Sequence, residues 1–326
     1  EIDTWIGGLD FPPLGSSVLF FGLVFVVSHI LSLPFDYYST FVIEEKYGFN
    51  KTTIQTFFLD KLKAYLLSLL VGGGLLLVFL WLIHSMGPDF WWQFWIVAVV
   101  FMVLVNVGYT AWILPLFNTL TPLAEGELRD KLLQYAAKVN FPVKHIFVMD
   151  GSRRSAKANA FFSGFGKQKK VVLYDTLLEQ HTPEELVAVL AHEIGHYKKK
   201  HLKWGMLVSV VEVGLLLFLL GQVVFSESMS LALGGTALSV PLNIIGFTML
   251  FAPLSMLMGI GMNALSRKHE FEADAYAKET FGGKPLAEAL KTLSVKSLST
   301  IHPHPWYVFV NYSHPPLLER LERLEH

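Results

Sequence analysis

The chain has 326 residues, of which 52% are hydrophobic and only 16% are charged, and its net charge is −1 at pH 7. Ordinary soluble proteins carry about a quarter charged residues, so this composition excludes a typical soluble domain and predicts a membrane protein. A near-neutral chain has no bulk attraction for nucleic acid, and we expect no nucleic-acid partner. The absence of cysteine excludes disulfides, a cysteine-ligated metal site and a thiol nucleophile.

Apolar segments long enough to cross a bilayer, which takes about 20 residues of helix, recur along the chain. The first segment, 18–33, is short and can cross the bilayer only together with its flanking residues. The third, 90–116, begins with an aromatic run typical of a membrane interface. The composition therefore predicts a polytopic, predominantly α-helical membrane protein with five spans, at 18–33, 64–83, 90–116, 204–225 and 241–265.

Lysine and arginine are concentrated in alternate connecting segments. They are frequent in 35–63, in 117–203 and directly after residue 265, and they are absent from 84–89 and 226–240. Because cytosolic loops are enriched in basic residues, this pattern predicts that the N-terminus lies outside and the C-terminus inside. It divides the chain into membrane spans (1–116, with a cytosolic loop at about 35–63), a polar region (117–203), a membrane hairpin (204–265) and a C-terminal segment (266–326).

The polar region combines short strands with helices. An amphipathic helix is predicted over 128–139, and short strands over 145–149, 159–162 and 170–174. A second helix is predicted to begin at Thr182, because Pro183 suits the first helical position and Glu185 completes a capping box with Thr182.

This second helix carries the motif H-E-x-x-H, formed by His192, Glu193 and His196. Residues four apart lie on one face of a helix, so both imidazoles can bind one metal ion, and Glu193 can reach a water molecule there. Catalytic zinc takes three protein ligands and keeps a position open for water. The alternative interpretation is a solvated helix face with two incidental histidines.

A third ligand is expected where the fifth span returns to the same side of the membrane. His269, Glu270 and Glu272 are the candidates. Glu270 is favoured over Glu272 because it shares a helix face with Asp274, so that one carboxylate can ligate the metal while the other orients a ligand histidine. For His269 and Glu272 we accept the simpler interpretation of solvation at the membrane interface.

The pairing of H-E-x-x-H with Glu270-x-x-x-Asp274 resembles the gluzincin arrangement of metallopeptidases. From about Phe35 to the C-terminus the chain is similar to the integral-membrane CAAX prenyl proteases, the type-I CAAX endopeptidases. Members of that family usually have seven spans, so we expect one or two N-terminal helices to be missing here. The stretches that carry the similarity are 39–50, 159–161, 173–178, 266–267 and 312–320.

The resemblance implies a small α+β gluzincin-like metalloprotease domain on the cytosolic side. It implies that His192, His196 and Glu270 bind one zinc ion per chain, with Asp274 orienting a ligand histidine. Glu193 is then the general base that takes a proton from water and passes it to the leaving amine. Zinc lowers the pKa of water towards neutrality and polarises the scissile carbonyl.

The resemblance also assigns substrate-handling residues. It makes His314 a donor to the oxyanion, with Arg320 nearby. Without the resemblance, the simpler interpretation is a loop histidine and a solvated arginine on a terminal helix. Asn159 and Ala160 are expected on an edge strand that takes the substrate backbone by β-augmentation; otherwise they are ordinary strand residues.

The implied substrate is a protein or peptide ending in a prenylated C-a-a-X sequence, from which the last three residues are removed. The alternative is a membrane quality-control zinc protease of broad specificity that does not depend on the prenyl group. The expected location is the endoplasmic reticulum membrane or nuclear envelope in a eukaryote, or the inner membrane in a bacterium.

Overall fold

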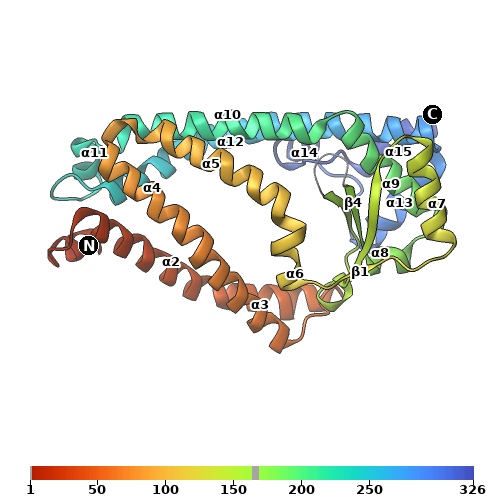
Figure 1. Cartoon of the computed structure of the whole chain (residues 1–326), viewed down its shortest axis with the longest axis horizontal. Coiled ribbons are helices and arrows are strands. Elements are labelled where there is room, and N and C mark those ends of the chain that lie inside the picture. The colour runs from red at the N-terminus through yellow and green to blue at the C-terminus, as the bar shows by residue number, and fades with distance from the viewer. Residues whose placement is uncertain (1, 164–168) are drawn as a thin grey trace. The chain divides into compact units, whose positions relative to one another are not determined.

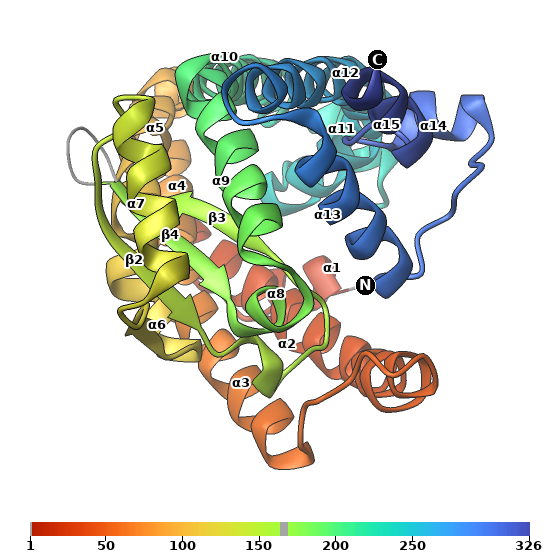
Figure 2. The same cartoon turned by 90° about the vertical axis from the view of Figure 1, so that its right-hand side faces the viewer.

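The computed structural model describes residues 2–163 and 169–326, and Figures 1 and 2 show it from two sides. The chain forms two compact units, each assembled from segments far apart in the sequence. The first unit comprises the segment up to Tyr47, Thr53–Leu104 and Met206–Ser255. The second comprises Gly48–Thr52, Val105–Gly205 and Met256–His326.

The first unit is built from helices. Some of these, α5, α10 and α12, also contribute residues to the second unit. The helices are α1 (Ile2–Gly7), α2 (Pro13–Tyr38), η1 (Ser39–Glu44), α3 (Ile54–Leu67), η2 (Ser68–Gly72), α4 (Gly73–Met86), η3 (Gly87–Asp89), α5 (Phe90–Gly108), α10 (His201–Val223), α11 (Glu227–Ala232) and α12 (Val240–Thr280).

Four continuous helical stretches in the described residues are long and apolar enough to cross a membrane: Pro13–Glu44, Ile54–Phe117, His201–Val223 and Val240–Thr280. The second contains two of the predicted spans, because the chain turns at Gly87 and α4 and α5 form separate arms (Figure 1). Gly87 has a φ of 58°, a conformation that glycine adopts without steric cost. All five predicted spans thus fall almost entirely within helices, and the chain is a polytopic helical membrane protein.

A buried polar cluster closes the hairpin between α10 and α12. The side-chain amide of Asn243 donates hydrogen bonds to the carbonyl oxygens of Val224 and Ser226, each at 2.9 Å. Its Oδ1 accepts a hydrogen bond of 2.9 Å from the hydroxyl of Ser230, which is also fully buried. The end of a helix leaves carbonyl groups without intrahelical partners, and Asn243 supplies a donor to the buried carbonyl of Val224, directly after α10.

The second unit contains a four-stranded sheet of order β1-β2-β4-β3. Strand β1 (Leu120–Pro122) pairs antiparallel with β2 (Val143–Met149), and β2 pairs parallel with β4 (Lys169–Tyr174). Strand β3 (Ala160–Ser163) pairs antiparallel with β4, with Ala160 opposite Leu173. In this part of the chain β3 is therefore an edge strand with one free side.

Helix α9 lies between this sheet and α13 (Figure 2). Leu186, Leu190 and Ile194 on one face of α9 are fully buried in the core of the unit, together with Val171 and Leu173 of β4. The remaining helices of the unit are η4 (Tyr109–Ile113), α6 (Leu114–Phe117), α7 (Glu127–Lys138), η5 (Gly151–Arg153), α8 (Asp175–Gln180), α9 (Pro183–Lys198), α13 (Gly283–Lys296), α14 (Pro305–Asn311) and α15 (Leu317–Glu325).

The elements predicted in the polar region are confirmed with shifts of one or two residues at their ends. The helix expected over 128–139 is α7, and the strands expected over 145–149, 159–162 and 170–174 are β2, β3 and β4. The start of α9 is confirmed in atomic detail. The hydroxyl of Thr182 accepts from the backbone N–H of Glu185 at 3.3 Å, and the carboxylate of Glu185 accepts from the backbone N–H of Thr182 at 3.3 Å.

We expect Asn243→Leu to lower the free energy of unfolding by about 1–3 kcal/mol, because the buried carbonyl oxygen of Val224 loses its side-chain donor and Ser226 and Ser230 each lose one of their partners. Thermal unfolding in detergent measures the change. Thr248→Val, at an exposed position of the same helix, is the control and should leave the melting temperature unchanged. A parental melting temperature for Asn243→Leu would contradict this account of the hairpin.

Candidate metal centre

Helix α9 presents the H-E-x-x-H residues on the face opposite its buried leucines. Because Leu186, Leu190 and Ile194 turn one face into the core, the helical period directs His192 and His196 away from it. His192 is buried and His196 is half-buried. The packing of α9 thus sets the direction in which both imidazoles point.

The variable position Gly195 of the motif lets α9 approach α12 closely. A Cβ atom at Gly195 would lie 3.0 Å from the Cα and 3.1 Å from the carbonyl oxygen of Ala273, and 3.2 Å from the Cβ of Tyr276. Two of these neighbours are backbone atoms, which cannot move aside as a flexible side chain can. The glycine therefore brings the backbone of α12 within reach of the motif.

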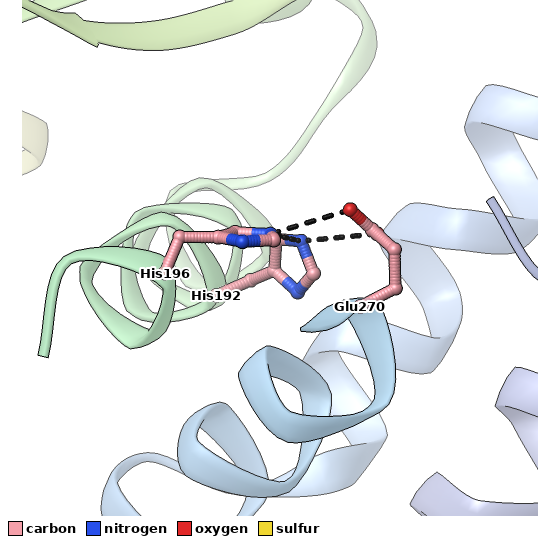
Figure 3. A group of neighbouring side chains, drawn as sticks. All are labelled: His192, His196 and Glu270. Carbon is pink, nitrogen blue, oxygen red and sulfur yellow. Dashed lines mark hydrogen bonds and ion pairs between the residues drawn. The ribbon is translucent and has the colours of Figure 1, made fainter. Parts of the chain in front are cut away.

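The approach of the two helices brings His192, His196 and Glu270 together (Figure 3). The Nε2 atoms of His192 and His196 lie 3.1 Å apart. Oε2 of Glu270 is 3.5 Å from Nε2 of His192, and Oε1 is 3.3 Å from Nε2 of His196. These residues lie far apart in the sequence but form one group in space.

The group fits a metal ion in both chemistry and geometry. A tetrahedral site with bonds of about 2.0–2.1 Å separates its ligand atoms by about 3.3–3.4 Å, close to the distances between these three side chains. Oε2 of Glu270 is buried and has only ion-pair contacts, with His192, His314 and Arg320, so it keeps the capacity to bind a cation. Imidazole and carboxylate are ligands that Zn²⁺ and similar ions accept.

The electrostatic surroundings of His192 also favour a positive charge. Burial lowers the pKa of His192, but the carboxylates of Asp274 and Glu270 outweigh burial and raise the pKa to about 9. The carboxylate field that stabilises a proton on this ring also stabilises a divalent cation at the same place.

Asp274 connects His192 to Arg320. Nδ1 of His192 lies 2.9 Å from Oδ1 of Asp274, a contact of ion-pair length. Arg320 donates two hydrogen bonds to Asp274, from Nε at 2.8 Å and from Nη2 at 2.7 Å. The positions three and four residues from Arg320 on α15 carry no acid, and its partner comes from α12.

Glu193 lies next to the His192 ligand face and is largely withdrawn from solvent. Burial raises the pKa of the Glu193 carboxyl above its ordinary value. A carboxyl group with a raised pKa accepts and returns a proton near neutral pH more readily than an exposed one. Glu193 also lines a cavity of about 420 Å³ that has aromatic walls.

His314 and Arg320 both reach the third member of the group. Nδ1 of His314 lies 3.1 Å from Oε2 of Glu270, and Nη1 of Arg320 lies 3.4 Å from the same oxygen. The His314 side chain is 67% exposed, whereas Arg320 is buried. The structure thus brings both predicted oxyanion donors beside the predicted metal ligands, His314 exposed to solvent and Arg320 held by Asp274.

Asn159 and Ala160 lie at the start of the edge strand. Ala160 is the first residue of β3, and Asn159 precedes it. The carbonyl oxygen of Asn159 accepts from the backbone N–H of Tyr174 at 3.0 Å, so the pairing with β4 begins there. The other side of β3 is available to an added strand in the described part of the sheet.

Sequence reasoning missed three residues beside the site. The sequence predicts solvation at the membrane interface for His269 and Glu272 and indicates no role for His201, but the three side chains form a contiguous group against His196. A signal was present, since His201 lies only five residues beyond His196. In an unbroken helix, however, residues five apart point about 140° apart, so the sequence spacing argues against their contact.

A polytopic helical membrane protein that brings the two histidines of an H-E-x-x-H helix together with a glutamate of a second helix has the features of an integral-membrane metallopeptidase. Residues 122–326 match peptidase family M48. Residues 2–119 match the CAAX prenyl protease N-terminal family, described as five membrane helices. The chain belongs to this family of membrane metallopeptidases, as the resemblance in its motifs indicated.

Individual relatives agree with the family. The chain is 41% identical over 314 residues to CAAX prenyl protease 1 homolog from rice, covering 95% of this chain and 73% of the relative. It is 37% identical to CAAX prenyl protease 1 from Saccharomyces cerevisiae, with 96% and 73% covered, and 33% identical to the human homolog, with 95% and 73% covered. The crystal structure of S. mikatae Ste24p matches with a TM-score of 0.92 at 36% identity, over 97% of this chain and 77% of that one.

We expect Gly195→Ala to weaken metal binding several-fold and Gly195→Val to weaken it further, because each added carbon pushes α12 away from α9. Chelator competition with Zn²⁺ measures the affinity. Gly205→Ala is the matched control, since a Cβ atom there meets nothing within 4 Å. Unchanged affinity in Gly195→Val would show that the close approach does not hold the ligands together.

We expect Arg320→Met to lower the free energy of unfolding of the metal-free protein by about 3–5 kcal/mol, because the buried Asp274 carboxylate loses both hydrogen bonds from the guanidinium and keeps only its contact with His192. Thermal unfolding in chelator measures the loss. Arg323→Met on the same helix removes only the contact of an exposed guanidinium with the Phe271 ring and should cost about 1 kcal/mol or less. Equal losses in the two variants would argue against a stabilising Asp274–Arg320 pair.

Proposed function

We propose that this chain is a zinc-dependent endopeptidase that removes the C-terminal tripeptide from prenylated C-a-a-X proteins at the membrane. The observation that carries the proposal is the group of His192, His196 and Glu270 beside Glu193, in a chain of the CAAX prenyl protease family. The relatives named above are themselves CAAX prenyl proteases, which disfavours a broad quality-control protease that ignores the prenyl group.

In the proposed mechanism, His192, His196 and Glu270 hold the zinc ion, and Asp274 orients His192. Zinc, when bound, supplies a Lewis acid that acidifies water and polarises a carbonyl group. Glu193 takes the proton from the attacking water and delivers it to the leaving amine. Its raised pKa suits both steps, because the group must bind the proton and then release it.

His314 and Arg320 are the proposed donors to the oxyanion that forms at the scissile carbonyl. Their positions 3.1 Å and 3.4 Å from Glu270 Oε2 support this role, since both already border the ligand group. Arg320 is held by its two hydrogen bonds to Asp274, so its guanidinium is positioned before substrate arrives. His314 is exposed and is free to meet the substrate.

We propose that the substrate backbone pairs with the free side of β3, starting at Asn159 and Ala160. Two cavities support an antiparallel direction for the bound peptide. The aromatic cavity of about 420 Å³ borders Phe161 and Phe162 in the second half of β3 and reaches Glu193. A second cavity, of about 580 Å³, is lined by Lys157 and Ala158 before β3 and reaches His314, Arg320 and Lys296.

A peptide antiparallel to β3 enters at Ser163 and leaves towards Asn159. The lipid-bearing side of the scissile bond then meets the aromatic cavity, where each buried CH₂ group contributes about 0.8 kcal/mol. The C-terminal side, with its free carboxylate, meets the cavity that carries the two lysines. The chemistry of both ends of a prenylated C-a-a-X segment matches the chemistry of the cavity that receives it.

The proposed organisation assigns the chemistry to 117–203 and 266–326, connected by the membrane hairpin 204–265, with the spans of 1–116 preceding them. The protein is an integral multi-pass membrane protein. Relatives from rice, yeast and human are all eukaryotic, which supports the endoplasmic reticulum membrane or nuclear envelope as its location.

Purified protein in detergent should hydrolyse a farnesylated C-a-a-X peptide after the modified cysteine, and a zinc chelator should abolish the reaction. Glu193→Gln should bind Zn²⁺ normally but lose at least about 100-fold in kcat, because the amide cannot accept the proton of water. Mass spectrometry of the released tripeptide and chelator competition measure the two effects.

The same peptide without its farnesyl group separates the proposed activity from broad proteolysis. A strong preference for the farnesylated peptide supports the proposal. Equal rates on both peptides would contradict prenyl dependence, and a fully active Glu193→Gln would refute the role of Glu193 as general base.

A further inference from the structure

A second group of polar side chains contacts the metal site from the side away from Asp274. His201, the first residue of α10, is buried, and its Nδ1 lies 3.0 Å from Nδ1 of His196. Its Nε2 lies 2.9 Å from Oε2 of Glu272. His269 stacks on the His201 ring, with centroids 3.9 Å apart and planes 9° apart. His201 is thus held on one face and at both nitrogens.

We propose that His201 and Glu272 are positioning residues that orient His196 for the metal ion through a hydrogen-bonded chain. The inference rests on the proposed role of His196 as a metal ligand. It assigns a function to two residues that the proposed mechanism does not use, and neither touches the substrate or the metal in this arrangement.

The chemistry of a metal-bound imidazole determines where each proton lies. His196 directs Nε2 towards the ligand group, so Nε2 carries no proton when a metal is bound and Nδ1 carries one. His196 then donates from Nδ1 to Nδ1 of His201. His201 must carry its own proton on Nε2, and it donates to the carboxylate of Glu272. Every donor meets an acceptor in this arrangement.

The two ligand histidines therefore receive carboxylate support in different ways. Asp274 faces Nδ1 of His192 directly, and it shares the side of α12 that carries Glu270. Glu272 lies two residues along the helix from each of them, so it points about 200° away. It reaches the site only because His201 lies between Glu272 and His196.

A strained turn puts His201 in this position. Helix α9 ends at Lys198 and α10 begins at His201, and Lys200 between them has a φ of 63°. A lysine in the left-handed region costs on the order of 1–3 kcal/mol, which the surrounding structure must offset. In an unbroken helix the side chains of His196 and His201 would point about 140° apart, and the turn at Lys200 instead brings them into contact.

Zinc affinity of the full-length protein in detergent, measured by chelator competition, tests the proposal without reading peptidase activity. His201→Phe keeps an aromatic ring to stack on His269 but removes the acceptor for His196. Loss of a partner that orients a ligand histidine typically costs 10–100-fold in metal affinity, and we expect a loss in that range. An affinity within twofold of the parent would overturn the proposal.

Glu272 provides a second pair of variants should His201→Phe fail to fold. Glu272→Met removes the acceptor for His201 and should weaken Zn²⁺ binding, whereas Glu272→Gln keeps an acceptor oxygen and should restore most of the affinity. Glu279→Gln, at an exposed position of the same helix, is the matched control and should bind like the parent. Equal affinities in Glu272→Met and Glu272→Gln would overturn the hydrogen-bonded chain.

A double-mutant cycle and thermal unfolding separate positioning from general stabilisation. Because Glu272 acts through His201, Glu272→Met should cost little further affinity in a His201→Phe background, whereas additive losses would contradict the proposal. The melting temperature of the metal-free protein should change little, and the increase on adding Zn²⁺ should shrink. A loss that is equal with and without Zn²⁺ would indicate only a structural role.

These readouts are independent of the proposed substrate. If the farnesylated peptide is not cleaved but the affinities follow this pattern, the proposed function fails and the positioning role stands. If the peptide is cleaved and the affinities do not change, the positioning role fails alone.

Discussion

The close approach of α9 to α12 at Gly195 is the constraint on which the candidate site depends. Two of the proposed ligands lie on α9 and the third on α12, so their separation is set by how near the two backbones come. Glycine permits contact between the backbone atoms of Ala273 and the motif, and the apolar core behind α9 holds the helix against that contact. Small changes in this spacing act directly on ligand geometry, because interiors are close-packed and transmit strain.

One helix, α12, supplies the acidic side of the site. Glu270 joins the ligand group, Asp274 meets both His192 and Arg320, and Glu272 acts at the far side through His201. Burying several carboxylates in one place is unfavourable unless positive charge accompanies them. Arg320 provides one such charge, and the group of His192, His196 and Glu270 is where a bound cation would provide more. The acidic cluster and the ligand group are therefore one electrostatic arrangement.

Much of the fold could be predicted because its signals are local. Apolar segments located the membrane helices, alternation located the strands, and the capping box at Thr182 located the start of α9 within a residue. The preference for Glu270 over Glu272 followed from the helical period, and Glu270 is the residue that lies with the histidines. The same argument gave Glu272 no role, because the helical period only tells which residues of α12 share a face. It cannot show that His201, from a different helix, lies beside the face that carries Glu272.

The sequence by itself determined the class of protein, the helix that carries both histidines and a short set of candidates for the third ligand. It could do so because composition, spacing and caps act over a few residues. Tertiary structure alone decided that Gly195 meets Ala273, that Arg320 pairs with Asp274, and that His201 connects Glu272 to His196. These contacts join residues far apart in the sequence or cross a strained turn at Lys200, and no local pattern specifies which side chains packing will bring together.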